Sequence, residues 1–220
     1  MVKEELIEFK DRNDAGVQLA SKLNNYKDKE GILVLTLPRG GVVVGYEIAS
    51  YLNCPLDVII IRKLGFPGNP ELAIGAISEN GTIILDEHMT SFYGISEEYI
   101  QEEISKQKAL IERRVNLYRK GNTLLDLKRK IVILVDDGVA TGATMKLAIS
   151  ILRVEEIKKL IVAIPVAPPE AAKELIRLTD ELVCLQTPYG FISVGSYYQD
   201  FTQVTDNDVV DILDRIKKNV

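Results

Sequence analysis

The sequence KIVILVDDGVATGATMKL, residues 130–147, decides the fold class of this chain. Its first part, residues 131–135, is apolar and mostly β-branched, too short to fill a helix and typical of a strand buried on both faces of a parallel sheet. Two carboxylates, Asp136 and Asp137, follow at once. A loop of small and hydroxylated residues comes next, and apolar residues recur at helical spacing from Met145. The stretch therefore predicts a strand, an acidic tip, a small-residue loop and a helix.

This loop has the chemistry of a phosphate site. Small side chains let a phosphate approach the backbone N–H groups at the positive end of the following helix, and Thr141 and Thr144 add hydroxyl donors. The carboxylates would repel a phosphate, so they suit sugar hydroxyls or a divalent cation carried by the ligand. The expected ligand is a sugar phosphate with magnesium. An ordinary strand-to-helix turn with a helix cap is the alternative, and the acidic pair together with the Thr-Gly-x-Thr loop argues against it.

The run VILVDDGVATGAT at residues 132–144 closely resembles the phosphoribosyl pyrophosphate (PRPP) motif of type I phosphoribosyltransferases. The resemblance implies that Asp136 and Asp137 hold the ribose hydroxyls, with Asp137 also catalytic, and that Mg²⁺ arrives with PRPP near this pair rather than in a site of protein ligands alone. It further implies that the 5′-phosphate is held by Val139, Ala140, Thr141, Gly142, Ala143 and Thr144. The sequence departs from the family at Gly138, where most members have an apolar residue. Ala140 stands where hypoxanthine-guanine enzymes have an acidic residue, so the motif names the donor and not the acceptor base.

A second strand, loop and helix is expected at residues 32–52. An apolar run ends in Pro-Arg-Gly-Gly, and a glycine-rich turn with a guanidinium can hold a pyrophosphate through backbone N–H groups and a bidentate fork. A simple turn with a solvated arginine explains the residues equally well when they are taken alone. The motif also resembles the pyrophosphate loop of the same family, which implies pyrophosphate binding by Arg39, Gly40 and Gly41. The resemblance places a non-proline cis peptide bond at Arg39–Gly40.

The next predicted strand, residues 56–61, delivers Arg62 and Lys63 at its end. Prolines, glycines and an asparagine at residues 64–70 predict an irregular loop, which is a candidate lid. A basic pair beside a mobile loop suits a pyrophosphate leaving group, on which negative charge grows as the bond to the sugar breaks. This segment resembles the family's flexible catalytic loop, with Arg62 and Lys63, and also Glu71, at matching positions. A solvated hairpin with surface charges is the alternative.

The remaining pattern alternates strands and helices and predicts an α/β fold. We expect a parallel sheet flanked by helices, a Rossmann-like core with a small hood and a flexible loop hairpin, in one domain over residues 1–220. The core covers about residues 32–185, and residues 186–220 with the N-terminal segment form the hood. Helices are expected at residues 11–23, 96–118, 170–178 and 207–220, a hairpin at 73–85, and strands at 160–166 and 183–185. Because ligands of such sheets bind at the carboxyl ends of the strands, the loops carrying Arg39, Arg62 and Asp136 are expected to converge there.

Residues 187–201 are rich in aromatics and have no helical period, which suits a cover over the sheet. Aromatic faces can stack on a planar base, so Tyr189, Phe191 and Phe201 are candidates for a base-binding hood, although aromatic residues more often serve packing alone.

Composition and sequence features disfavour several classes of protein. The chain has 220 residues, 46% of them hydrophobic, and a net charge of −5, so general attraction to nucleic acid or anionic membranes is not expected. No apolar run reaches the length of a membrane span, and the charged start does not suit a signal peptide, so we expect a cytoplasmic protein. His88 is the single histidine and has no partner motif, which disfavours a hydrolytic triad.

The expected function is therefore a PRPP-dependent phosphoribosyltransferase that acts on a nitrogenous base, works with Mg²⁺ and forms a homodimer. A non-catalytic sensor of PRPP or a nucleotide with the same fold is the alternative from another class, and hydrolysis of a phosphosugar is a third. Retention of Arg62 and Lys63 favours catalysis, and the acidic net charge disfavours an RNA-binding sensor.

Overall fold

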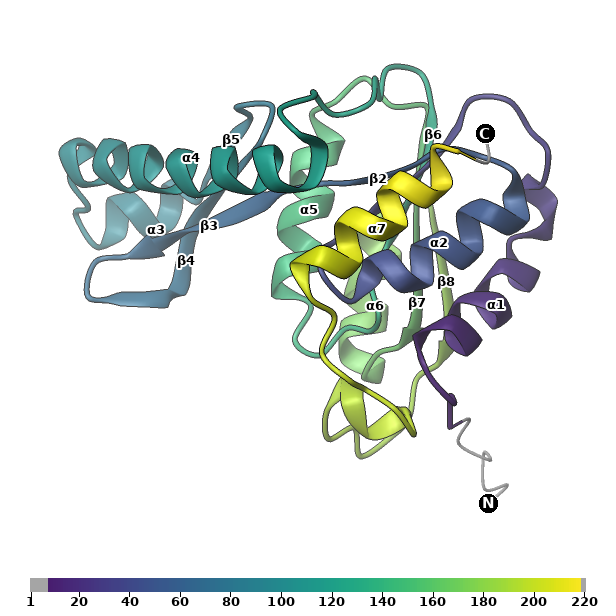
Figure 1. Cartoon of the computed structure of the whole chain (residues 1–220). Coiled ribbons are helices and arrows are strands. Elements are labelled where there is room, and N and C mark those ends of the chain that lie inside the picture. The colour runs from purple at the N-terminus through teal and green to yellow at the C-terminus, as the bar shows by residue number, and fades with distance from the viewer. Residues whose placement is uncertain (1–7, 219–220) are drawn as a thin grey trace.

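The computed structural model describes residues 8–218, except the side chain of Glu71, and its centre is a five-stranded parallel sheet. The strand order is β2-β1-β6-β7-β8, with every neighbouring pair parallel. The strands are β1 (Ile32–Thr36), β2 (Leu56–Val58), β6 (Ile131–Val135), β7 (Lys159–Val166) and β8 (Glu181–Gln186). The α/β fold with a parallel sheet flanked by helices, predicted from the sequence, is confirmed (Figure 1).

Helices cover both faces of this sheet because its strands bury side chains on both sides. Val34 and Ile133 belong to one core with α1 (Arg12–Lys22), α2 (Gly41–Leu52) and α7 (Asp206–Ile216). Side chains one position away, such as Leu33 and Leu134, join the opposite core with α5 (Ala143–Arg153) and α6 (Pro169–Leu178). The alternation follows from the two-residue period of a strand, and it explains why the strand sequences are continuously apolar.

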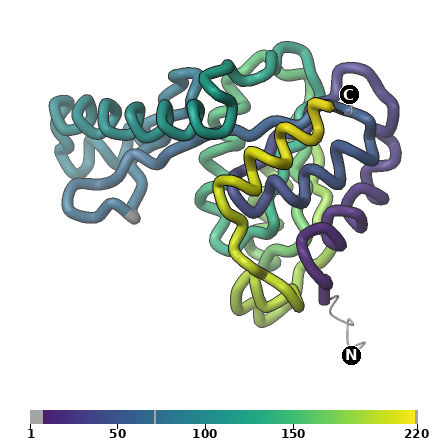
Figure 2. Tube along the Cα trace, viewed as in Figure 1, coloured from purple at the N-terminus to yellow at the C-terminus, as the bar shows by residue number. Residues whose placement is uncertain are grey.

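A second unit projects from one side of the core as an arm (Figures 1 and 2). It contains a three-stranded antiparallel sheet in the order β3-β4-β5, together with two helices. Its elements are β3 (Ile61–Phe66), β4 (Asn69–Ser78), β5 (Ile83–Leu85), α3 (Glu87–Phe92) and α4 (Glu97–Arg119). The long helix predicted from Ser96 is confirmed, and the Ser96 side chain accepts the Tyr99 N–H at its start.

The arm corrects two predictions. The strand expected at residues 56–61 ends at Val58, and the chain then enters β3 of the separate sheet. The segment expected as an irregular loop, residues 64–70, lies mostly in the β3–β4 hairpin, with register shifts at Leu64–Gly65 and Gly65–Phe66. These β-bulges accommodate glycine and proline, which disfavour a regular strand. Proline has no N–H to donate to a neighbouring strand, and an irregular pairing does not require that hydrogen bond. The hairpin predicted around residues 79–81 is confirmed as β4–β5.

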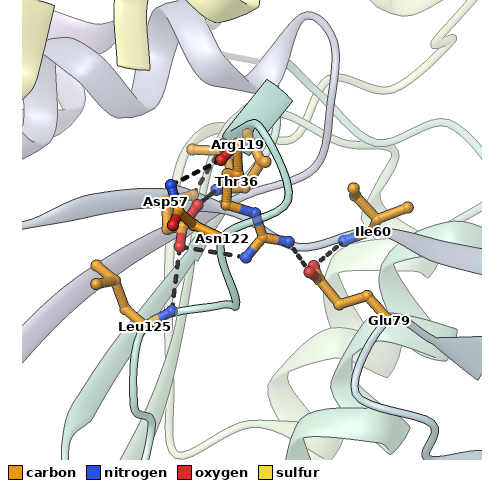
Figure 3. Close-up of polar contacts among 8 residues, drawn as sticks. Thr36, Asp57, Ile60, Glu79, Arg119, Asn122 and Leu125 are labelled. Atoms are coloured by element: carbon orange, nitrogen blue, oxygen red, sulfur yellow. Dashed lines mark hydrogen bonds and ion pairs between the residues drawn. The ribbon is translucent and has the colours of Figure 1, made fainter. Parts of the chain in front are cut away.

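A buried ionic network joins the arm to the core (Figure 3). Arg119, the last residue of α4, pairs with Asp57 of β2 at 3.5 Å and with Glu79, just after β4. Asp57 also accepts the Leu125 N–H at 3.2 Å, and Glu79 accepts the Ile60 N–H at 2.9 Å. Burial raises the pKa of Asp57, and the charge of Arg119 opposes that shift. Three segments far apart in sequence are therefore fixed through one guanidinium.

The N-terminal segment and the tail after β8 meet beside the carboxyl edge of the parallel sheet. After β8 the tail forms the short 3-10 helix η2 (Val194–Tyr197), and Tyr198 pairs in parallel with Phe9 from the N-terminal segment. The chain then enters α7, which begins at Asp206 behind a capping box on Thr205. The predicted terminal helix is confirmed to Ile216, and its predicted last two residues lie outside the described part. Among residues 8–218, no helix combines the length and apolarity that a membrane span requires.

Candidate functional site

The candidate site lies where the order of strands reverses. Strands β1 and β6 are neighbours, and the chain continues from β1 to one edge of the sheet and from β6 to the other. The helices that follow them, α2 and α5, cover opposite faces. The chain after the two strands therefore leads to opposite faces of the sheet, and the carboxyl edge at such a reversal is the usual ligand position in open α/β sheets.

Two glycines bring these loops into contact. A Cβ on Gly40 would lie 1.8 Å from Oδ2 of Asp137, and a Cβ on Gly41 would lie 2.9 Å from the Asp136 Cα and the Val135 carbonyl oxygen. No real Cβ approaches other atoms so closely, so any larger residue would push the loops apart. The Pro-Arg-Gly-Gly motif is thus pressed against the acidic tip, and two of the segments singled out in the sequence form one surface.

The acidic tip is held by internal hydrogen bonds. Asp136 Oδ1 accepts the N–H of Asp137 at 2.9 Å. Burial, followed by the nearby charge of Asp137, raises the pKa of Asp136 well above its ordinary value. Tyr198 of the tail donates its hydroxyl to the Asp137 carbonyl oxygen at 2.5 Å. The buried setting of Asp136 therefore favours its protonated form.

Arg12 is a site residue that the sequence did not reveal. Its Nε donates to Asp137 Oδ2 at 2.7 Å, one Nη donates to the Thr202 carbonyl at 2.9 Å, and its guanidinium carbon lies 3.8 Å from the centroid of the Phe201 ring. Arg12 and Asp137 are 125 positions apart, and locally Arg12 shows only the start of a helix. The ion pair with Arg12 fixes the orientation of the Asp137 side chain.

Gly138, the departure from the family motif, has a steric explanation. A Cβ there would lie 2.5 Å from a methyl carbon of Val194, the first residue of η2. The tail thus packs directly on the start of the small-residue loop. An apolar side chain at this position would displace the tail.

The small-residue loop presents its N–H groups unevenly. The N–H of Val139 is already donated to the Val166 carbonyl at 2.9 Å, and the Val139 side chain is buried. Ala140, Thr141, Ala143 and Thr144 are exposed. They surround a cavity of about 160 Å³ in front of α5, whose first turn follows Gly142 in the left-handed conformation at φ 76°. The expected phosphate contacts at residues 140–144 are compatible with this geometry, whereas Val139 would contribute through packing.

The loop after β1 contains a non-proline cis peptide bond, but at Pro38–Arg39 and not at Arg39–Gly40 as predicted. The Arg39 and Gly40 carbonyls already accept the first N–H groups of α2, those of Val42 and Val43. Gly40 itself has helical angles of φ −59° and ψ −38°. A guanidinium nitrogen of Arg39 lies 3.9 Å from Asp206 at the start of α7.

Arg62 and Lys63 do not leave the carboxyl end of a parallel strand, which corrects the expectation of three converging loops. Both lie within β3 on the arm, where they oppose Ile77 and Ala76 of β4. Successive residues of a strand point to opposite faces, so the pair is split between the two sides of the sheet. Arg62 Nε donates to Gln107 of α4 at 3.0 Å. The position of Arg62 and Lys63 was predicted wrongly because an apolar pattern indicates a strand but does not indicate which sheet the strand joins.

The three aromatic hood candidates have different surroundings. Tyr189 is 85% exposed. Phe191 stacks on Tyr197 with a centroid separation of 5.5 Å. One face of Phe201 is covered by Arg12, and its ring also lies 5.0 Å from Tyr198. Of the three, Tyr189 has the most open face toward solvent.

Within the described residues, no group of three or more histidine, cysteine, aspartate or glutamate side chains could hold a metal ion. The adjacent carboxylates Asp136 and Asp137 nevertheless fit a Mg²⁺ that takes most of its ligands from a bound diphosphate and water.

Comparisons with known proteins give consistent matches. The family model described as "Phosphoribosyl transferase domain" matches residues 5–200. Two curated relatives, each named "Putative phosphoribosyl transferase" in Mycobacterium tuberculosis strains CDC 1551 and H37Rv, are 41% identical over 211 residues, which is 96% of this chain and 47% of theirs. The chain thus spans about half the length of these relatives. A crystal structure of TT1426 from Thermus thermophilus is similar with a TM-score of 0.85 and 42% identity, covering 94% of this chain and 98% of that one.

Proposed function

The chain belongs to the phosphoribosyl transferase family, and we propose that it transfers the 5-phosphoribosyl group of PRPP to a ring nitrogen of a base and releases pyrophosphate. One observation carries the proposal: Gly40 and Gly41 press the arginine loop against the acidic tip at the reversal of the strand order. This contact sets a candidate pyrophosphate loop beside a candidate ribose site, as a donor that carries both groups on one sugar requires.

The residues have separate roles in this proposal. Asp136 and Asp137 accept hydrogen bonds from the ribose hydroxyls, and Arg12 holds Asp137 in position. The backbone and hydroxyls of residues 140–144 bind the 5′-phosphate at the start of α5, where the helix dipole favours an anion. Arg39, with the N–H groups around Gly40 and Gly41, faces the pyrophosphate. Arg62, and Lys63 if the hairpin moves, add positive charge from the arm.

The proposed step is a substitution at C1 of the ribose with inversion. A nitrogen lone pair of the base forms the new bond as the bond from C1 to the pyrophosphate oxygen breaks, and the electron pair leaves with pyrophosphate. The base then loses its ring proton to solvent or to a basic group. Positive charge develops on the sugar and negative charge on the leaving group, so carboxylates at the ribose and arginines at the diphosphate both stabilise the transition state. Mg²⁺ bound with the diphosphate would neutralise part of that negative charge.

The acceptor is proposed only as a nitrogenous base. Ala140 offers no carboxylate to a purine ring nitrogen, and the hood candidates include one open aromatic face, on Tyr189. We also propose one domain for the whole chain, a cytoplasmic location and a homodimer. Exposed aromatics on the arm, Phe92 at 73% and Tyr93 at 57%, are available for such an interface.

The first test is the exchange Asp137→Asn. It removes the charge at the ribose while keeping the shape of the side chain, so we expect PRPP-dependent release of pyrophosphate to fall by at least about 10²-fold, the scale found when one stabilising group is removed. Asp214→Asn is the matched control, because Asp214 pairs with Lys120 on the exposed side of α7. Circular dichroism checks that both variants fold. Unchanged turnover in Asp137→Asn would exclude this assignment.

A second measurement separates transferase from sensor. Calorimetry with PRPP and Mg²⁺ is followed by a screen of purine, pyrimidine and related bases for pyrophosphate release. Release that depends on a particular base supports the transferase and identifies the acceptor. Binding without release for every base supports a non-catalytic sensor, and release without any base supports a hydrolase.

A further inference from the structure

A cavity between the arm and the core is rich in arginines. It has a volume of about 250 Å³, below the usual range for organic ligands of drug size and suited to a compact ion. We call it the arginine pocket; its lining residues are Arg62, Leu110, Arg113, Arg114, Leu117 and Asp206. They come from β3, α4 and α7, so the cavity lies where α4 passes from the arm to the core (Figure 1).

The pocket has an excess of positive charge. Three of its lining residues are cationic and one is anionic, although the whole chain has a net charge of −5. Burial, and then the charge of Arg114, lower the pKa of Arg62, and the charge of Glu103 offsets these effects only in part. Clustered arginines of this kind are the usual recognition element for phosphate groups.

The nearby carboxylates are already committed. Glu103 lies near Arg62, but it accepts from Gln107 at 2.7 Å, from Lys106 at 3.2 Å and from the Gly65 N–H. Among the described side chains, the neutral amide of Gln107 joins Arg62 to this group. Asp206 accepts the Tyr118 hydroxyl at 2.5 Å and lies 3.9 Å from Arg39. The described carboxylates therefore neutralise the arginines incompletely.

Asp206 also connects the pocket with the loop after β1. Its contact with Arg39 is long and both side chains are partly exposed, Arg39 at 35% and Asp206 at 44%, so the pair is weak and can exchange for a stronger anion. Arg39 thus stands at the edge of the arginine pocket as well as beside the acidic tip.

We propose that the arginine pocket binds a diphosphate group, with Arg113 and Arg114 of α4 as binding residues and Asp206 as an internal counter-ion that the ligand displaces from Arg39. The inference rests on the proposed function, because it places the diphosphate end of the donor here. It adds residues of the long helix that neither the PRPP motif nor the Pro-Arg-Gly-Gly loop contains. It also gives the arm a role in the chemistry, since closing α4 and β3 on the core would tighten the pocket around the leaving group.

The test measures the binding of Mg²⁺–pyrophosphate and of ribose 5-phosphate by calorimetry. In Arg114→Gln we expect pyrophosphate to bind roughly tenfold more weakly, the loss of about one charge-assisted contact, and ribose 5-phosphate to bind within about twofold of the wild type. In Asp206→Asn we expect pyrophosphate to bind several-fold more tightly, because the competing carboxylate is gone. Lys108→Gln is the control, with the same change of charge at an exposed position of α4 outside the pocket.

Pyrophosphate affinity is expected to fall in Arg114→Gln and to rise in Asp206→Asn. A general loss of folding would lower the affinity in both variants, so it cannot produce this result. Unchanged pyrophosphate affinity in Arg114→Gln, equal losses in Arg114→Gln and Lys108→Gln, or no binding of pyrophosphate by the wild type would overturn the inference. The proposed function fails differently, if the wild type binds neither PRPP nor ribose 5-phosphate. If the wild type turns over PRPP but Arg114→Gln binds pyrophosphate as tightly as the wild type, the inference about the arginine pocket is wrong and the proposed function stands.

Discussion

Arg12 links the first helix of the chain to the centre of the candidate site. Its side chain is 9% exposed and that of Asp137 is 15% exposed, so neither charge is well hydrated and each depends on the other. Stacking on Phe201 and the bond to the Thr202 carbonyl hold the guanidinium in one orientation. The same side chain thereby contacts both the tail and a proposed ribose ligand, so the position of the tail is linked to the geometry of the acidic tip.

We expect Arg12→Met to destabilise the protein by about 3 kcal/mol at neutral pH, because removing one partner of a mostly buried pair leaves the other charge uncompensated. Asp137→Asn in the same chain should recover part of that loss, since no buried charge is then left unpaired. Urea unfolding of the wild type, both single variants and the double variant gives the coupling energy. A coupling energy near zero would mean that the 2.7 Å contact contributes nothing to stability.

At the scale of elements, local patterns predicted most helices and strands correctly. Strand β6 has the predicted bounds, and α4 is within one residue of its predicted span, because a cap and an apolar period are properties of neighbouring residues. Partners could not be predicted in the same way. Nothing near Arg62 says that its strand joins a second sheet, and nothing near Arg12 points to Asp137, because both facts depend on long-range packing.

The arm depends on Arg119, where α4 ends. We expect Arg119→Met to cost about 3–5 kcal/mol, because Asp57 and Glu79 are buried and would lose their shared cation. Hydrogen exchange should increase first in β3, β4 and α4, which the network attaches to β2. The neighbouring Lys120 pairs with Asp214 at an exposed position, so Lys120→Gln should stay within about 0.5 kcal/mol of the wild type. Equal losses in the two variants would show that the buried network has no special role.

Over the whole molecule, opposing carboxylates set the dependence of stability on pH. Hydrogen bonding by Lys159 and Tyr26 outweighs burial and lowers the pKa of Glu181, and the Leu160 N–H lowers the pKa of Asp180. Such groups stabilise the fold above their unfolded pKa values, and this contribution is lost as the pH falls through the folded values. Asp136 acts in the opposite direction, since burial and Asp137 raise its pKa. As the solution becomes more alkaline, the contribution of Asp136 to stability therefore changes in the opposite direction to those of Asp180 and Glu181.

This opposition gives a prediction for Asp136→Asn. In the wild type, the folded state keeps a proton on Asp136 at pH values where the unfolded chain has released it. The contribution of this group to the free energy of unfolding therefore falls as the pH rises from the ordinary aspartate pKa to the raised pKa of the folded state. Asparagine removes the titration and can still accept the Asp137 N–H. The Tm of the variant should therefore gain on that of the wild type as the pH rises, by about 2–4 °C for each kcal/mol relieved in a chain of this size. Thermal unfolding of both proteins between about pH 4 and pH 9 gives the difference in Tm at each pH, in which the shared contributions of Asp180 and Glu181 cancel.

A difference in Tm that does not change with pH would show that Asp136 has the same pKa in the folded and unfolded states. Burial of the acidic tip would then not raise the pKa of Asp136.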